Sequence, residues 1–93
     1  LMSDARKIAV LVRDRQGEAL RMAVGLTLED DEVSVFNIGG PIESNDSNDL
    51  NVETLGEFDC GRYSVNGGDN GFEQMNIEDI AQKILECDHI VPY

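Results

Sequence analysis

KIAVLVR at residues 7–13, QGEALRMAVGLTLE at 16–29 and EVSVFNI at 32–38 decide the fold of this chain. The first stretch contains a continuous apolar run, which is typical of a strand that is covered on both faces. The second repeats its apolar residues with helical spacing, and the third again has the character of a strand. Strand, helix and strand in this order predict a parallel α/β sheet, in which ligands bind at the carboxyl ends of the strands.

The middle of the chain is polar and contains few residues that could enter a core. ESNDSNDLNVET at residues 43–54 predicts a loop, flexible over 43–51, with a short helix near 52–57. Beyond it we expect, in chain order, a strand, a glycine-rich turn and a short strand or extended segment, within residues 58–65, 66–71 and 72–75.

The last helix has the clearest pattern in the sequence. Asn76 is a good N-cap, and Asp79 three residues later completes an approximate capping box. The apolar residues that follow form one helical stripe, namely Ile77, Ile80, Ala81, Ile84 and Leu85. A final strand over residues 88–91 is predicted to end at Pro92.

Length and charge restrict the class of protein. The 93 residues predict one domain, with a net charge of −12. Residues 1–28 hold five basic and three acidic side chains, for a charge of +2, whereas residues 29–93 hold two basic and sixteen acidic ones, for −14. This balance repels phosphate backbones and acidic membrane surfaces, so neither nucleic acid nor membrane is expected as a partner. Leu1 in front of Met2 suggests a cloning remnant, and residues 1–6 are expected to be such a remnant or disordered.

Three loops at the expected strand ends are candidates for a ligand site. Arg13 and Arg15 precede the first helix and could hold a small anion there, although nearby Asp14 and Glu18 oppose this. The other two candidate loops contain the pairs Gly39 with Gly40 and Asn66 with Gly67. None of the loops carries GxGxxG or GxxxxGK[ST], so no nucleotide cofactor is predicted.

Two cysteines and one histidine limit the available chemistry. Together they cannot supply the four ligands of a structural zinc site, and no metal is predicted. Two cysteines are also too few for a disulfide framework, which favours a reducing, cytoplasmic setting. Cys60 is the candidate nucleophile, but of the charges near it only Arg62 favours a thiolate, while Glu57 and Asp59 oppose one. Cys87 is expected to be structural, because it lies between acidic residues at the end of the last helix.

KIAVLVRDRQGEALRMAVGLTLEDDEVSVFNIGGPIE and the tail EDIAQKILECDHIVPY resemble the two end segments of the DsrE/DsrF-like family, which includes TusD-type sulfur-relay proteins. The two segments together span 53 of the 93 residues. It implies a three-layer α/β/α fold with a mostly parallel sheet of four to five strands, in which the last strand lies next to the first. It also implies homotrimers, or hexamers made from related subunits.

The resemblance leaves two functions open, and they differ in the role of Cys60. Some family members carry sulfur as a persulfide on a cysteine that follows a central strand. Cys60, in FDCGRYSVNGG, falls before or within the third expected strand instead. The chain is therefore expected to be a sulfur-relay subunit with Cys60 as its carrier and a sulfur donor or acceptor as its partner, or a non-catalytic binding or assembly subunit of the same fold. A small-ligand module at the strand ends is a third possibility, for which the sequence has no motif.

Overall fold

The structure is a computed structural model that describes residues 6–29 and 31–93. The expectation for residues 1–6 therefore lies outside the described residues, except at Arg6. Strands and helices alternate along the chain in the order β1 (Lys7–Val12), α1 (Gln16–Thr27), β2 (Glu32–Asn37), α2 (Asp46–Glu57), β3 (Gly61–Ser64), β4 (Glu73–Gln74), α3 (Ile77–Ile84) and β5 (His89–Pro92).

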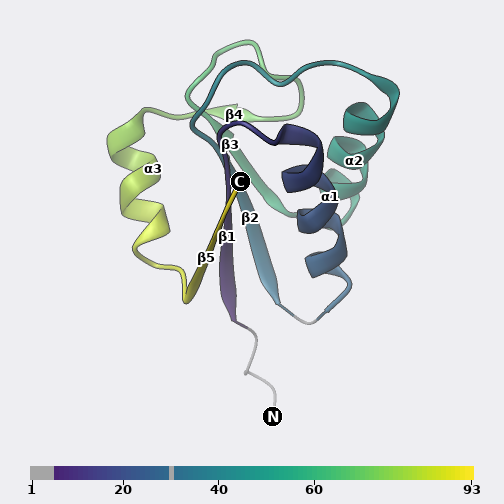
Figure 1. Cartoon of the computed structure of the whole chain (residues 1–93). Coiled ribbons are helices and arrows are strands. Elements are labelled where there is room, and N and C mark those ends of the chain that lie inside the picture. The colour runs from purple at the N-terminus through teal and green to yellow at the C-terminus, as the bar shows by residue number, and fades with distance from the viewer. Residues whose placement is uncertain (1–5, 30) are drawn as a thin grey trace.

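All strand pairs are parallel, and the sheet has the order β4-β3-β2-β1-β5. In the central register Val10 lies opposite Val35 on one side and Val91 on the other. Figure 1 shows α1 and α2 on one face of the sheet and α3 on the opposite face. The predicted fold class is confirmed: helices flank a five-stranded parallel sheet, with the last strand beside the first.

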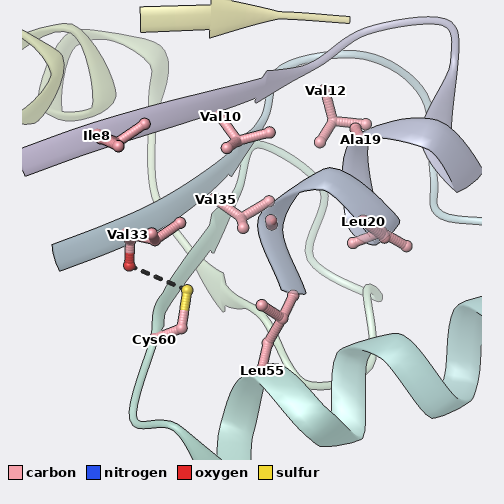
Figure 2. Close-up of a cluster of buried hydrophobic side chains, with 10 residues drawn as sticks. Ile8, Val10, Val12, Ala19, Leu20, Val33, Val35, Leu55 and Cys60 are labelled. Carbon is pink, nitrogen blue, oxygen red and sulfur yellow. Dashed lines mark hydrogen bonds between the residues drawn. The ribbon is translucent and has the colours of Figure 1, made fainter. Parts of the chain in front are cut away.

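Each face of the sheet has its own hydrophobic cluster, because successive side chains of a strand point to opposite faces. Val10 and Val35 belong to the cluster beneath α1 and α2, part of which is drawn in Figure 2. Ala9, Phe36 and Ile80 form the smaller cluster beneath α3. Phe36 also stacks on Tyr63, with 5.4 Å between the ring centroids. The βαβ unit read from the sequence therefore supplies the centre of both clusters.

Helix α2 begins six residues before the short helix expected near residues 52–57, which corrects the prediction of a loop over residues 43–54 from Asp46 onward. It begins at Asp46, where the side chain of Asn45 accepts a 2.8 Å hydrogen bond from the Asn48 amide. Acidic residues in its first turn suit the positive end of the helix dipole. Few apolar residues are needed, because Leu55 is fully buried and the buried Asn48 donates to the Glu43 carbonyl oxygen at 2.9 Å. A cap and a single buried leucine are weak signals in a polar sequence.

Helix α3 begins as predicted, with the Asn76 side chain accepting a 2.8 Å hydrogen bond from the Asp79 amide. Its apolar stripe is only partly covered. Ile80 is fully buried, whereas Ile77 is 50% exposed and Leu85, just after the helix, is 78% exposed. In residues 6–29 and 31–93 there is no helix long and apolar enough to cross a membrane.

Candidate functional site

Cys60 lies immediately before β3, at the amino-terminal end of the sheet. Ligands of open parallel sheets bind at the opposite end. The sequence left open whether Cys60 lies before the third strand or within it, and the structure places it before that strand. Cys60 is therefore at the opposite end of the sheet from the loops that follow the strands. It is held there by the way α2 ends.

Helix α2 ends in a Schellman motif that carries the chain down to Cys60. Asp59 adopts a left-handed conformation with φ of 56°, and its amide donates to the Gly56 carbonyl oxygen at 3.1 Å. The Cys60 amide donates to the Leu55 carbonyl oxygen at 3.0 Å. This motif commonly brings the residue after the turn into hydrophobic contact with the last turn of the helix. Cys60 and Leu55 belong to the same buried cluster, so Cys60 serves as that apolar residue.

The Cys60 thiol is buried in this cluster. The residue is only 6% exposed, and its Sγ donates a 3.0 Å hydrogen bond to the Val33 carbonyl oxygen (Figure 2). Burial raises the pKa of Cys60 to about 11, although the positive charge of Arg62 acts to lower it. Because the thiolate is the nucleophilic form, Cys60 is a poor nucleophile near neutral pH in this conformation.

Cys87, just after α3, is also a neutral thiol. Its Sγ lies 3.6 Å from the Lys83 carbonyl oxygen, to which it donates. Partial burial is the main cause that raises the pKa of Cys87; Lys7 lowers it, and neighbouring Glu86 and Asp88 raise it further. The expectation of a structural role for Cys87 agrees with this environment.

The loops after β2 and β3 meet at the carboxyl end of the sheet, the upper end in Figure 1. The Asn66 side-chain amide donates to the Gly39 carbonyl oxygen at 3.0 Å. Gly39 also lies against the backbone of Arg13, where any side chain on Gly39 would collide with the Arg13 carbonyl oxygen. Three of the predicted loops are therefore brought together. Gly40 joins them by accepting a 2.9 Å hydrogen bond from the Asn37 side-chain amide.

Backbone amides that could bind an anion at the start of α1 already donate hydrogen bonds within the chain. The Asp14 and Arg15 amides both donate to the Tyr93 carbonyl oxygen, at 3.2 and 3.0 Å. The Arg15 side chain forms a 3.3 Å ion pair with Glu18 and lies over the Tyr93 ring. Arg13 is exposed. Gly67, the remaining predicted residue, is exposed on the turn and faces the Gln74 side chain.

A buried polar network holds these loops, and the sequence reading missed it. Asn37 and Ser64 are fully buried at the ends of β2 and β3, and Asp69 is 8% exposed. One carboxylate oxygen of Asp69 accepts from the Asn37 amide at 2.8 Å and from the Ser64 hydroxyl at 2.6 Å. The other accepts from the Ile42 amide at 2.9 Å. A signal was present, because Asn37 directly follows an apolar strand and Asp69 lies within the glycine-rich turn.

Asp69 remains charged although it has no cationic partner in the network. Burial is the largest influence on its pKa and acts to raise it. The hydrogen bonds from Ser64, Ile42 and Asn37, with a further contribution from Asn66, outweigh burial and hold the pKa below its ordinary value. Every buried polar side-chain atom of the described residues is satisfied, and the network holds the loops together.

Comparison with family models, curated proteins and solved structures finds no match to this chain. In the part of the chain that the structure describes, no three or more His, Cys, Asp or Glu side chains gather in a way that could hold a metal ion.

Proposed function

We propose that this chain is a DsrE/DsrF-like binding and assembly subunit, linked to cytoplasmic sulfur relay, in which Cys60 does not carry sulfur. The observation that carries this proposal is the closure of the thiol, which is 6% exposed, bonded to the Val33 carbonyl oxygen and shifted to a pKa of about 11. The parallel sheet with its last strand beside the first supports the family resemblance. The loops at the carboxyl end, which hydrogen bonds from Asn37 and Asn66 hold together, support a binding role.

A working sulfur carrier at Cys60 is the alternative, and it would make the chain sulfurtransferase-like. One observation favours it: Arg62 lies close enough to lower the pKa of Cys60 in part. Carriage would then require the chain to open around Cys60, because a persulfide needs room for a second sulfur atom where the thiol now contacts the Val33 carbonyl oxygen.

Incubation with a low-molecular-weight persulfide donor, followed by intact mass measurement, separates these two functions. The proposal predicts no gain of a sulfur atom at Cys60 at neutral pH, so that the wild type and Cys60→Ser behave alike. The Cys87→Ser variant removes the contribution of the second thiol. A sulfur atom gained by Cys87→Ser but not by Cys60→Ser would replace the proposal with the carrier function.

Assembly into homotrimers, or into hexamers with related subunits, is part of the same proposal. It is supported by the outer strand β5, which pairs only with β1 within the described residues. Apolar side chains remain uncovered near this edge, with Ile90 50% exposed and Leu85 78% exposed. Native mass spectrometry at micromolar concentration tests it, and a strict monomer would contradict it.

A further inference from the structure

A cavity separate from both cysteines lies between α2 and the turn that joins β3 to β4. Its volume is about 440 Å³, and it is partly open to solvent. This lies within the range of roughly 300–1,000 Å³ that is common for small-molecule sites. Apolar surface comes from Ile42 and Val52, and the charged groups are Arg62, Asp49 and Glu53.

The Arg62 side chain is held in place beside this cavity. Its Nε donates a 3.0 Å hydrogen bond to the Cys60 carbonyl oxygen, which fixes the side chain against β3. A Cβ built on Gly56 would lie 3.1 Å from Nη1 of Arg62, and one on Gly71 would lie 3.6 Å from it. Both glycines line the cavity. Among the described residues no hydrogen-bond partner or carboxylate within 4.0 Å is found for Nη1 or Nη2.

The opposite charge comes from one face of α2. Asp49, Val52, Glu53 and Gly56 follow helical spacing and all line the cavity. The Asp49 carboxylate already accepts the Ser44 hydroxyl at 3.0 Å. Glu53 is exposed and has no hydrogen bond or ion pair to another described residue. The cavity therefore presents one cation and one available carboxylate that do not pair with each other.

We propose that this cavity binds a small zwitterion of the amino-acid class. The ligand carboxylate lies on the Arg62 guanidinium, whose planar fork suits two hydrogen bonds to a carboxylate. The ligand ammonium lies on Glu53, and an apolar side chain contacts Val52 and Ile42. A simple anion would be repelled by Glu53 and Asp49, and a simple cation by Arg62, whereas a zwitterion satisfies both charges.

The inference deepens the proposed binding role and rests on it, but the two fail separately. The persulfide experiment measures whether the protein gains a sulfur atom at Cys60, and the ligand experiment measures binding beside Arg62 and α2. L-leucine is the probe, because it carries both charges and an apolar side chain. Titration is followed by nuclear magnetic resonance of the Arg62 Nε–H and the Gly56 and Gly71 amides. N-acetyl-L-leucine, which lacks the ammonium, and L-leucinamide, which lacks the carboxylate, are the matched ligands.

Glu53→Gln and Arg62→Gln test the two charges, and Glu57→Gln is the control on an exposed part of the same helix outside the cavity. Glu53→Gln is expected to weaken L-leucine binding about tenfold, as loss of one charge-assisted hydrogen bond does, and Arg62→Gln, which loses two, should weaken it at least as much. Glu57→Gln should leave the affinity unchanged. Because Glu53 is exposed, its variant remains informative if Arg62→Gln does not fold. The proposal is overturned if millimolar L-leucine shifts none of these signals, or if both derivatives bind as tightly as L-leucine. It is also overturned if Glu53→Gln binds L-leucine as tightly as Glu57→Gln does.

Discussion

The two ends of the parallel sheet are covered in different ways, one by hydrophobic packing and the other by hydrogen bonds to a buried carboxylate. At the amino end, Cys60 and Leu55 pack into a hydrocarbon cluster, and the thiol is kept neutral. At the carboxyl end, Asn37 and Ser64 surround the Asp69 carboxylate and keep it charged. The thiol at the amino end is thus held in its unreactive, neutral form. The surroundings of each of these two groups determine whether it is neutral or charged.

The apolar end is expected to be the more costly to disrupt. Leu55→Ala removes a fully buried side chain and should lower the free energy of unfolding by about 3 kcal/mol. Leu50, on the same helix, is 61% exposed, and Leu50→Ala should change that free energy by less than about 0.5 kcal/mol. Urea unfolding of the two variants makes the comparison. Equal losses would show that the two faces of α2 are assigned wrongly.

The polar end is tested by Asp69→Ala, which leaves the buried donors of Asn37 and Ser64 without their acceptor. The loss should be about 2 kcal/mol. Asp14→Ala, at an exposed carboxylate in a neighbouring loop, is the control and should be close to neutral. A loss as small as that of the control would mean that the network contributes little to stability.

The same variant predicts a dependence on pH. The pKa of Asp69 is lower in the folded state than its ordinary value of 3.8, so the carboxylate stabilises the fold above that value. This contribution is lost as the pH falls through the lowered pKa. The difference in stability between the wild type and Asp69→Ala should be constant from about pH 5 to 7 and decrease below about pH 4. A difference that grows on acidification would contradict the sign of the shift.

The smallest expected effect lies at the turn that delivers Cys60 to the apolar end. Asp59 has φ of 56°, a conformation that glycine adopts without a steric penalty. Asp59→Gly should therefore stabilise the fold by about 0.5–1 kcal/mol, and Asp59→Ala should be less stable than the glycine variant. Thermal unfolding of the three proteins gives the order. If the alanine variant is the most stable, the left-handed turn is not present in solution.

Much of the fold could be predicted from the sequence, because apolar period distinguishes strands from helices. The βαβ unit, the third strand and the Asn76 cap agree with the structure. The short helix expected near residues 52–57 is the second half of α2. The first half was missed because the segment is polar and the stability of the helix rests on capping by Asn45 and on one buried leucine, Leu55. Periodicity also could not tell that Leu85 would stay exposed, since that depends on how much of the sheet lies opposite α3.

The site was predictable only in its location. The loops containing Gly39 and Asn66 do meet at the carboxyl end of the sheet. The Asn37–Asp69 contact joins residues 32 positions apart, so no local pattern reveals it. Arg62 was read only as a neighbour of Cys60 in sequence, whereas its terminal nitrogens line a cavity beside α2. Hydrogen bonding between residues far apart in the sequence, rather than residue type, determines which of these groups can bind a ligand.

The central claim is that Cys60 is a closed, neutral thiol, and its alkylation rate as a function of pH tests this most directly. In the Cys87→Ser variant, reaction of the native protein with iodoacetamide is followed by mass. The structure predicts slow labelling at neutral pH that rises only as the pH approaches about 11, with rapid labelling once the protein is unfolded. Labelling of the native protein at neutral pH as fast as that of the unfolded chain would contradict it.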